Sequence, residues 1–101
     1  MKTLTDEIKA ELRTMIFEYF ADECETDIDE LSDETNVMDE LDADSLMVVE
    51  LIEAAKKKYD LNIKLQTVGK FLLKNPAETL GEIVELFNKL YIYEDDIINE
   101  A

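Results

Sequence analysis

Hydrophobic residues recur every three or four positions over most of this 101-residue chain, which is the spacing of amphipathic helices. The pattern predicts helices over residues 5–22, 45–59, 65–73 and 76–92, of which the third is the shortest. Only two glycines and one proline are present, which disfavours a turn-rich β architecture. We therefore predict an all-α fold, a small four-helix bundle of three main helices and a short third one, in a single domain over residues 1–101.

Local signals support the ends of these helices. Residues 56–58 are all lysine, and cations in a last turn are favoured by the helix dipole. Before the last helix, Asn75 is a good N-cap, Pro76 suits the first helical position, and Glu78 completes a capping box. These residues predict that the last helix begins at Pro76.

Residues 22–44 separate the first two helices and are dominated by acids. The chain has no lysine or arginine between Thr14 and Ala55. Scattered apolar residues in this segment predict an ordered loop attached to the core, and ordered loops of this length are often functional. The tail over residues 94–101 is also acidic, and we expect it to fray.

A calcium-binding loop of the EF-hand type is disfavoured in this acidic segment. Such a loop needs an oxygen ligand at its fifth position, a glycine at its sixth and a glutamate at its twelfth. The register from Asp27 places Leu31 at the fifth position, and the register from Asp42 places Leu46 and Met47 at the fifth and sixth. We predict no metal site.

Charge and composition narrow the classes of partner. The formal net charge is −16, from 26 acidic and 10 basic residues, so nucleic acid and anionic membranes are poor partners and basic protein surfaces are good ones. The chain has no apolar run long enough to span a membrane, and its first residues lack the apolar core of a signal peptide. With Cys24 the only cysteine, no internal disulfide can form. We expect a cytoplasmic monomer that does not insert into membranes.

Ser45 lies at the junction between the acidic loop and the second helix. Asp44 before it is a good N-cap, so these two residues alone are compatible with an ordinary helix start. Catalysis by the serine is disfavoured, because the chain has no histidine to activate it and no GxSxG motif around it. A phosphodiester on Ser45 would be favoured, since unpaired N–H groups and the positive end of the dipole lie at a helix N-terminus.

The residues around this junction resemble the signature of acyl carrier proteins. That family reads approximately LGxDSL, followed by a VEL helix and an aromatic residue. This chain has LDADSL over 41–46, Val-Glu-Leu over 49–51 and Lys-Tyr over 58–59. The resemblance also covers the helix order and the long loop, over about residues 5–92, and it implies a carrier rather than an enzyme, with no catalytic residue.

The resemblance implies a role for each residue of the motif. Ser45 would carry a 4′-phosphopantetheine arm, transferred from coenzyme A by a phosphopantetheinyl transferase, with an acyl group held as a thioester. Asp44 would contact the transferase and its magnesium, and Leu46 completes the attachment motif. Glu50 and Glu53 would lie on the helix that docks on basic patches of acyl-loading and synthase enzymes.

The stripe of the second helix supplies further candidates. We expect Val49, Ile52, Ala55 and Tyr59 to line an acyl cavity, although plain core packing explains each of them equally well. Met47 and Lys57 are candidate partner contacts on the same helix, and an exposed methionine without a partner is the alternative for Met47.

The chain departs from the family pattern in several places. Asp42 stands where the family has glycine, and aspartate tolerates the left-handed backbone region better than most residues. Lys56 and Lys57 replace acids, and the segment over residues 65–75 is longer than usual. These departures favour a specialised carrier with its own partners.

Three functional hypotheses remain open. The first is a carrier for fatty-acid, polyketide or related biosynthesis, whose cargo the sequence does not identify. The second is an acidic helical adaptor that has the carrier fold without the prosthetic group. The third and weakest is a serine hydrolase.

Overall fold

The computed structural model describes residues 2–100, apart from the side chains of Ser45 and Glu100, and within this part of the chain the regular elements are all helices, with no strand. The all-α prediction is confirmed. The helices are α1 (Asp6–Glu23), α2 (Val37–Glu40), α3 (Ser45–Tyr59), α4 (Leu65–Lys74) and α5 (Leu80–Tyr93), with short 3-10 segments η1 (Ile28–Glu30) and η2 (Glu94–Glu100).

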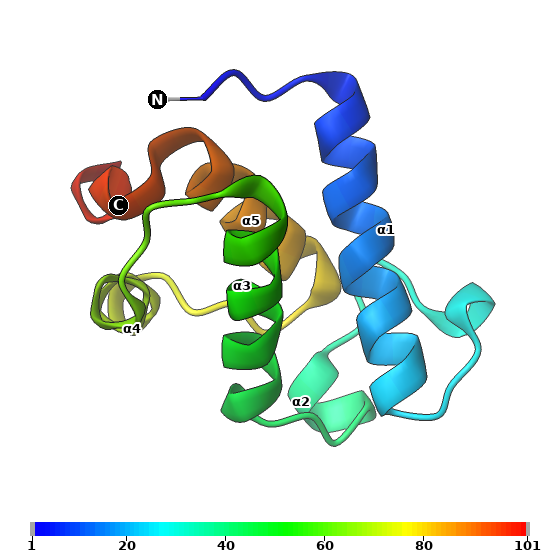
Figure 1. Cartoon of the computed structure of the whole chain (residues 1–101). Coiled ribbons are helices and arrows are strands. Elements are labelled where there is room, and N and C mark those ends of the chain that lie inside the picture. The colour runs from blue at the N-terminus through cyan, green and yellow to red at the C-terminus, as the bar shows by residue number, and fades with distance from the viewer. Residues whose placement is uncertain (1, 101) are drawn as a thin grey trace.

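The helices enclose one hydrophobic core. In Figure 1, α1 and α4 lie on opposite sides of α3 and α5, and η2 lies beside α4. The core is formed by apolar residues at helical spacing, and its fully buried members include Leu12, Ile16, Phe20, Leu51, Ile52, Ile83, Phe87 and Leu90. Burial of these stripes, rather than helix propensity alone, accounts for most of the helix stability.

The last long helix begins at Leu80, four residues later than the sequence pattern predicts. Asn75 instead ends α4, and its N–H donates to the Phe71 carbonyl at 2.9 Å. The capping box is formed by Thr79 and Glu82, in which Thr79 Oγ1 accepts from the Glu82 N–H and Glu82 accepts from the Thr79 N–H. Two capping boxes follow each other in this sequence, and tertiary contacts select the second one.

Those tertiary contacts come from the acidic loop. The Val37 N–H donates to the Glu78 carbonyl, and the N–H groups of Leu80 and Gly81 donate to the carbonyls of Thr35 and Asp33, all at 2.9 Å. Gly81 is required for this approach, because a Cβ there would lie 3.0 Å from both Cβ and O of Asp33. The loop is therefore ordered, and its second half forms the short helix α2, which Asn36 caps.

We expected the acidic tail to fray, but most of it forms a short helical segment. Residues Glu94–Glu100 form η2, and Ile97 within it has no exposed surface. The sequence pattern underestimated this segment because a single apolar anchor among acids gives no periodic signal. No helix within residues 2–100 is both long and apolar enough to cross a membrane.

Candidate attachment site and apolar cavity

The start of α3 is held by its own loop. Asp44 is the N-cap, and its Oδ1 accepts from the Met47 N–H at 3.1 Å. Asp42 has a φ of +58°, so an aspartate occupies the left-handed turn in which the family pattern has glycine. Between them, Ala43 is buried and donates its N–H to the Val37 carbonyl at 2.9 Å. The first residue of α3 is therefore fixed from both sides.

Ser45 is that first helical residue, and its side chain lies outside the described part of the structure. Its neighbour Asp44 is exposed, and the Leu46 side chain is 61% exposed. Met47 is half-buried and packs against the core, so it is not the fully exposed methionine of the alternative interpretation, and its role as a partner contact stays a prediction. Leu46 is thus the apolar side chain that α3 presents to solvent beside the serine.

An apolar cavity of about 330 Å³ lies between the first turns of α3 and the helix α4. Val48 and Val49 line it from α3, three and four positions after Ser45, so they lie on the same face of the helix as that residue. Glu78 is the one charged residue of its lining. The complete lining is Met38, Val48, Val49, Ile52, Leu65, Val68, Gly69, Leu72, Pro76, Ala77 and Glu78.

The lining differs in part from the sequence prediction. Of the four residues predicted to line an acyl cavity, Val49 and Ile52 line this one, whereas Ala55 is buried in the core and Tyr59 lies against α1. The reason is that α4 covers only the first half of α3, so the later residues of the stripe meet other partners. The opposite wall was missed, although Leu65, Val68 and Leu72 stand at helical spacing in the sequence.

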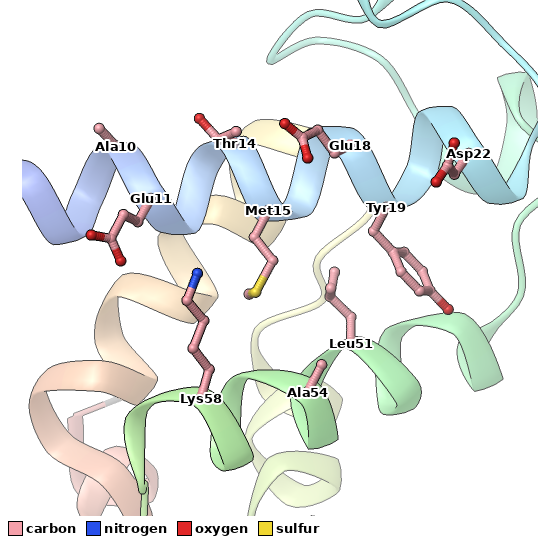
Figure 2. Close-up of a pocket in the computed structure, with 10 residues that line it drawn as sticks. All are labelled: Ala10, Glu11, Thr14, Met15, Glu18, Tyr19, Asp22, Leu51, Ala54 and Lys58. Atoms are coloured by element: carbon pink, nitrogen blue, oxygen red, sulfur yellow. The ribbon is translucent and has the colours of Figure 1, made fainter.

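A wider hollow of about 580 Å³ separates α1 from α3 (Figure 2). Its floor is apolar, but Glu11, Glu18 and Asp22 of α1 lie along it, and Lys58 reaches toward α1 from the other side. These charges make it a poorer place for an acyl chain than the cavity between α3 and α4. The remaining lining residues are Ala10, Thr14, Met15, Tyr19, Leu51 and Ala54.

Two tyrosines bridge α1 and α3 across this hollow. Tyr19 OH of α1 donates to Glu50 Oε2 of α3 at 2.9 Å, and Tyr59 OH of α3 donates to Glu11 Oε1 of α1 at 2.8 Å. Burial and the hydrogen-bonded carboxylate raise the pKa of Tyr59 to about 12, and the same causes raise the pKa of Tyr19. Both phenols therefore stay neutral and keep donating over the physiological pH range.

The remaining candidate partner contacts lie on the exposed side of α3. Glu50, Glu53 and Lys57 are all exposed, and Glu53 Oε1 lies 3.7 Å from Lys56 Nζ. Lys56 is half-buried, so other parts of the fold cover some of its surface. Of the two lysines that replace family acids, Lys57 is the one that points fully to solvent.

Comparison with known proteins gives consistent matches. Residues 16–87 match the family described as the phosphopantetheine attachment site. An acyl carrier protein homolog of Clostridium acetobutylicum is 57% identical over 99 residues, which cover 98% of this chain and 96% of that protein. An acyl carrier protein of Picosynechococcus sp. is 41% identical over 54 residues, which cover 48% of this chain and 67% of that protein. No solved structure gives a significant match.

The two tyrosine bridges predict how stability falls at alkaline pH. A phenol whose pKa is raised by folding stabilises the folded state fully at pH values below its unfolded pKa of 10.0. This stabilisation is lost as the pH rises through the pKa of the folded protein. We expect Tyr19→Phe/Tyr59→Phe to lower the free energy of unfolding by about 1 kcal/mol per bond near neutral pH. The difference from wild type should shrink as the pH rises from 10.0 to about 12.

Urea unfolding at a series of pH values measures this difference. A difference that stays constant over the alkaline range would contradict the prediction. As a control, Glu11→Gln keeps an acceptor for Tyr59 without the charge, so ultraviolet titration should show a Tyr59 pKa below the wild-type value of about 12.

Proposed function

This chain belongs to the acyl carrier protein family, and we propose that Ser45 bears its prosthetic group and that the cavity between α3 and α4 receives the acyl chain. The protein is a carrier rather than an enzyme, and the group that its family carries is 4′-phosphopantetheine. The cavity supports the proposal best, because Val48 and Val49, which line it, lie on the face of α3 that begins with Ser45.

The residues around Ser45 fit the prosthetic group. A phosphodiester at the first residue of α3 gains from the positive end of the helix dipole. Its neighbours on both sides are exposed, which leaves room for a transferase to approach. When bound, the group supplies a thiol that holds an acyl chain as a thioester, and this chain's residues position and shelter what it holds.

Asp44 has two roles in this proposal. As the N-cap it fixes the first turn of α3, and by the family resemblance its carboxylate contacts the transferase and the magnesium ion. One carboxylate oxygen accepts from Met47, and a carboxylate has a second oxygen to offer. The two roles are therefore compatible.

The cavity favours an aliphatic cargo. A water molecule fills about 30 Å³ of liquid, so 330 Å³ holds on the order of ten groups of that size, such as methylenes. Glu78 is the one charged residue of the lining, so a charged cargo would lose hydration along the rest of the cavity, where no residue carries a charge to pair with it. We propose cytoplasmic fatty-acid, polyketide or related biosynthesis as the setting.

The exposed side of α3 is the proposed docking surface. It presents Leu46 at its start, with Glu50, Glu53 and Lys57 along its length. Basic patches of loading and synthase enzymes would meet the carboxylates, and Leu46 would supply an apolar contact beside the arm. Met47, which packs against the core, would hold this surface as well as contact the partner.

The attachment predicts a single modification. Incubation of the protein with a phosphopantetheinyl transferase, magnesium and coenzyme A should add the mass of one phosphopantetheine group, and Ser45→Ala should gain none. Intact-protein mass spectrometry measures both. An unmodified wild-type chain, under conditions that modify a control carrier, would leave the adaptor hypothesis in place.

A second variant separates the two roles of Asp44. Asn and Asp are equally good N-caps, so Asp44→Asn should keep the helix start while removing the carboxylate. We expect its circular dichroism to match wild type and its modification to be at least about tenfold slower, as expected when one charged contact is lost. Full-rate modification would show that Asp44 serves the fold alone.

If the cavity shelters the acyl chain, a larger side chain that fills the cavity should leave the acyl thioester exposed to solvent. Gly69 lines the cavity, and a Cβ added there meets no atom within 4 Å. Gly69→Leu should therefore occupy part of the cavity while improving helix propensity by up to about 1 kcal/mol. We expect an octanoyl thioester on this variant to react with hydroxylamine severalfold faster than on wild type.

The acetyl thioester is the internal control, because it is too short to fill the cavity and should react equally on both proteins. Gly69→Ala gives the matched small change and should protect the octanoyl chain almost as well as wild type. Equal protection of the octanoyl chain by all three proteins would place the cargo elsewhere.

The docking surface predicts a charge effect on the rate of modification. Glu53→Lys should slow modification by the transferase about threefold to tenfold at low salt, because electrostatic steering is lost. Glu85→Lys makes the same charge change at an exposed position of α5 and should slow it much less. At about 1 M salt, where the screening length is about 3 Å, the rates should converge. Equal slowing by both variants would mean that net charge matters and α3 does not.

A further inference from the structure

The start of α4 lacks a cap of its own. Lys64 occupies the N-cap position, and its side chain makes no capping hydrogen bond. The first N–H groups of a helix have no partner within the helix, so another group has to satisfy them. In this protein that group comes from η2, about 30 residues later in the sequence.

Two acids of η2 accept hydrogen bonds from the backbone that leads into α4. Asp95 Oδ1 accepts from the Lys64 N–H at 2.9 Å, and Glu94 Oε2 accepts from the Asn62 N–H at 2.6 Å. The bond from the Lys64 N–H stabilises the carboxylate and is the main reason that the pKa of Asp95 is lowered. Asp95 therefore satisfies the N–H of the N-cap residue of α4, as the glutamate of a capping box does in other helices.

A buried side chain holds these acids in place. Ile97 has no exposed surface and belongs to the hydrophobic core. The most extensive backbone contacts of α4 are those with η2, which also packs against the end of α5 (Figure 1). The segment thus connects the hydrophobic core to α4.

The helix held in this way forms a wall of the cavity. Leu65, Val68, Gly69 and Leu72 of α4 all line it, and Leu65 directly follows the capped residue. Any change in the position of α4 therefore changes the width of the space that faces α3. Within the carrier function proposed above, we propose that η2 clamps α4 and sets the size of the acyl cavity, with Asp95 and Ile97 as positioning residues.

Hydrogen exchange on the unmodified protein tests the clamp without the prosthetic group. Asp95→Ala should raise the exchange rates of amides in the first half of α4 about fivefold, the change in opening that a lost N-cap typically produces. The amides of α1 should keep their wild-type rates. Asp95→Asn retains an acceptor oxygen and should restore protection, whereas Asp96→Ala removes the neighbouring exposed acid and should have no effect.

The second measurement asks whether the clamp acts on the cargo. With the arm loaded, Asp95→Ala should raise the reactivity of a hexanoyl thioester toward hydroxylamine about fivefold, in step with the opening of α4. An acetyl thioester does not reach the cavity and should react within twofold of wild type, which a general loss of stability would not explain. Ile97→Val, which removes one methyl group from the anchor, should shift both readouts in the same direction.

The outcomes separate this inference from the carrier function. If α4 exchanges equally in wild type and Asp95→Ala, or if Asp96→Ala behaves like Asp95→Ala, η2 is not a clamp. If α4 loosens but hexanoyl reactivity stays unchanged, the clamp serves the fold and does not set the cavity. If mass spectrometry finds no modification of Ser45, the proposed function fails, while hydrogen exchange still decides whether η2 clamps α4.

Discussion

The backbone hydrogen bonds between the acidic loop and the start of α5 are the constraint on which the rest of the structure depends. Residues 33–37 exchange them with residues 78–81, and the close approach requires a glycine at position 81. The Val37 carbonyl then accepts from the Ala43 N–H, and Asp44, the residue after Ala43, caps α3. The position of Ser45 is thus determined by contacts with a segment more than 30 residues away. These contacts attach the acidic loop to α5, and Asp44 caps α3 locally.

The strong negative charge of the chain determines which groups its carboxylates contact. With 26 acids and 10 bases, most carboxylates cannot find a cation, and three ion pairs are formed among residues 2–100. Backbone N–H groups take the place of cations: Glu40, Asp44, Glu82 and Asp95 each accept from one at a helix end or turn. Tyrosine hydroxyls do the same for Glu11 and Glu50. The acids are therefore compatible with the fold because many of them cap it, and the exposed remainder stays available to basic partners.

Sequence reasoning succeeded where structure is determined locally. The bounds of α1, α3 and α4 lie within one residue of those that periodicity predicts, and Asp44 is the N-cap that its position indicates. It failed where distant segments decide. Asn75 and Thr79 both begin a valid capping box, and only the loop contacts select Thr79. Ala55 and Tyr59 belong to the apolar stripe of α3, but the crossing of α4 decides which part of that stripe faces the cavity. The anchoring role of Ile97 was invisible for the same reason, since two adjacent isoleucines among acids show no helical period.

Local sequence signals and contacts between distant segments give different parts of the molecule different mechanical properties. The long helices α1 and α5 pack directly on each other, and the tyrosine bridges join α1 to α3, so the helix that begins with Ser45 is tied to the core. A rigid attachment point is what a transferase or synthase needs in order to recognise the same surface on every encounter. The cavity needs the opposite property, because a chain can enter only if one wall yields. That wall is α4, which includes a glycine and depends for its first turn on an acid from another segment. Helix propensity is lowered by the glycine, and a cap supplied from a distance is lost whenever its segment moves away. In the function that we propose, the protein thus combines a docking face and a yielding cavity wall on the two sides of the same helix, α3.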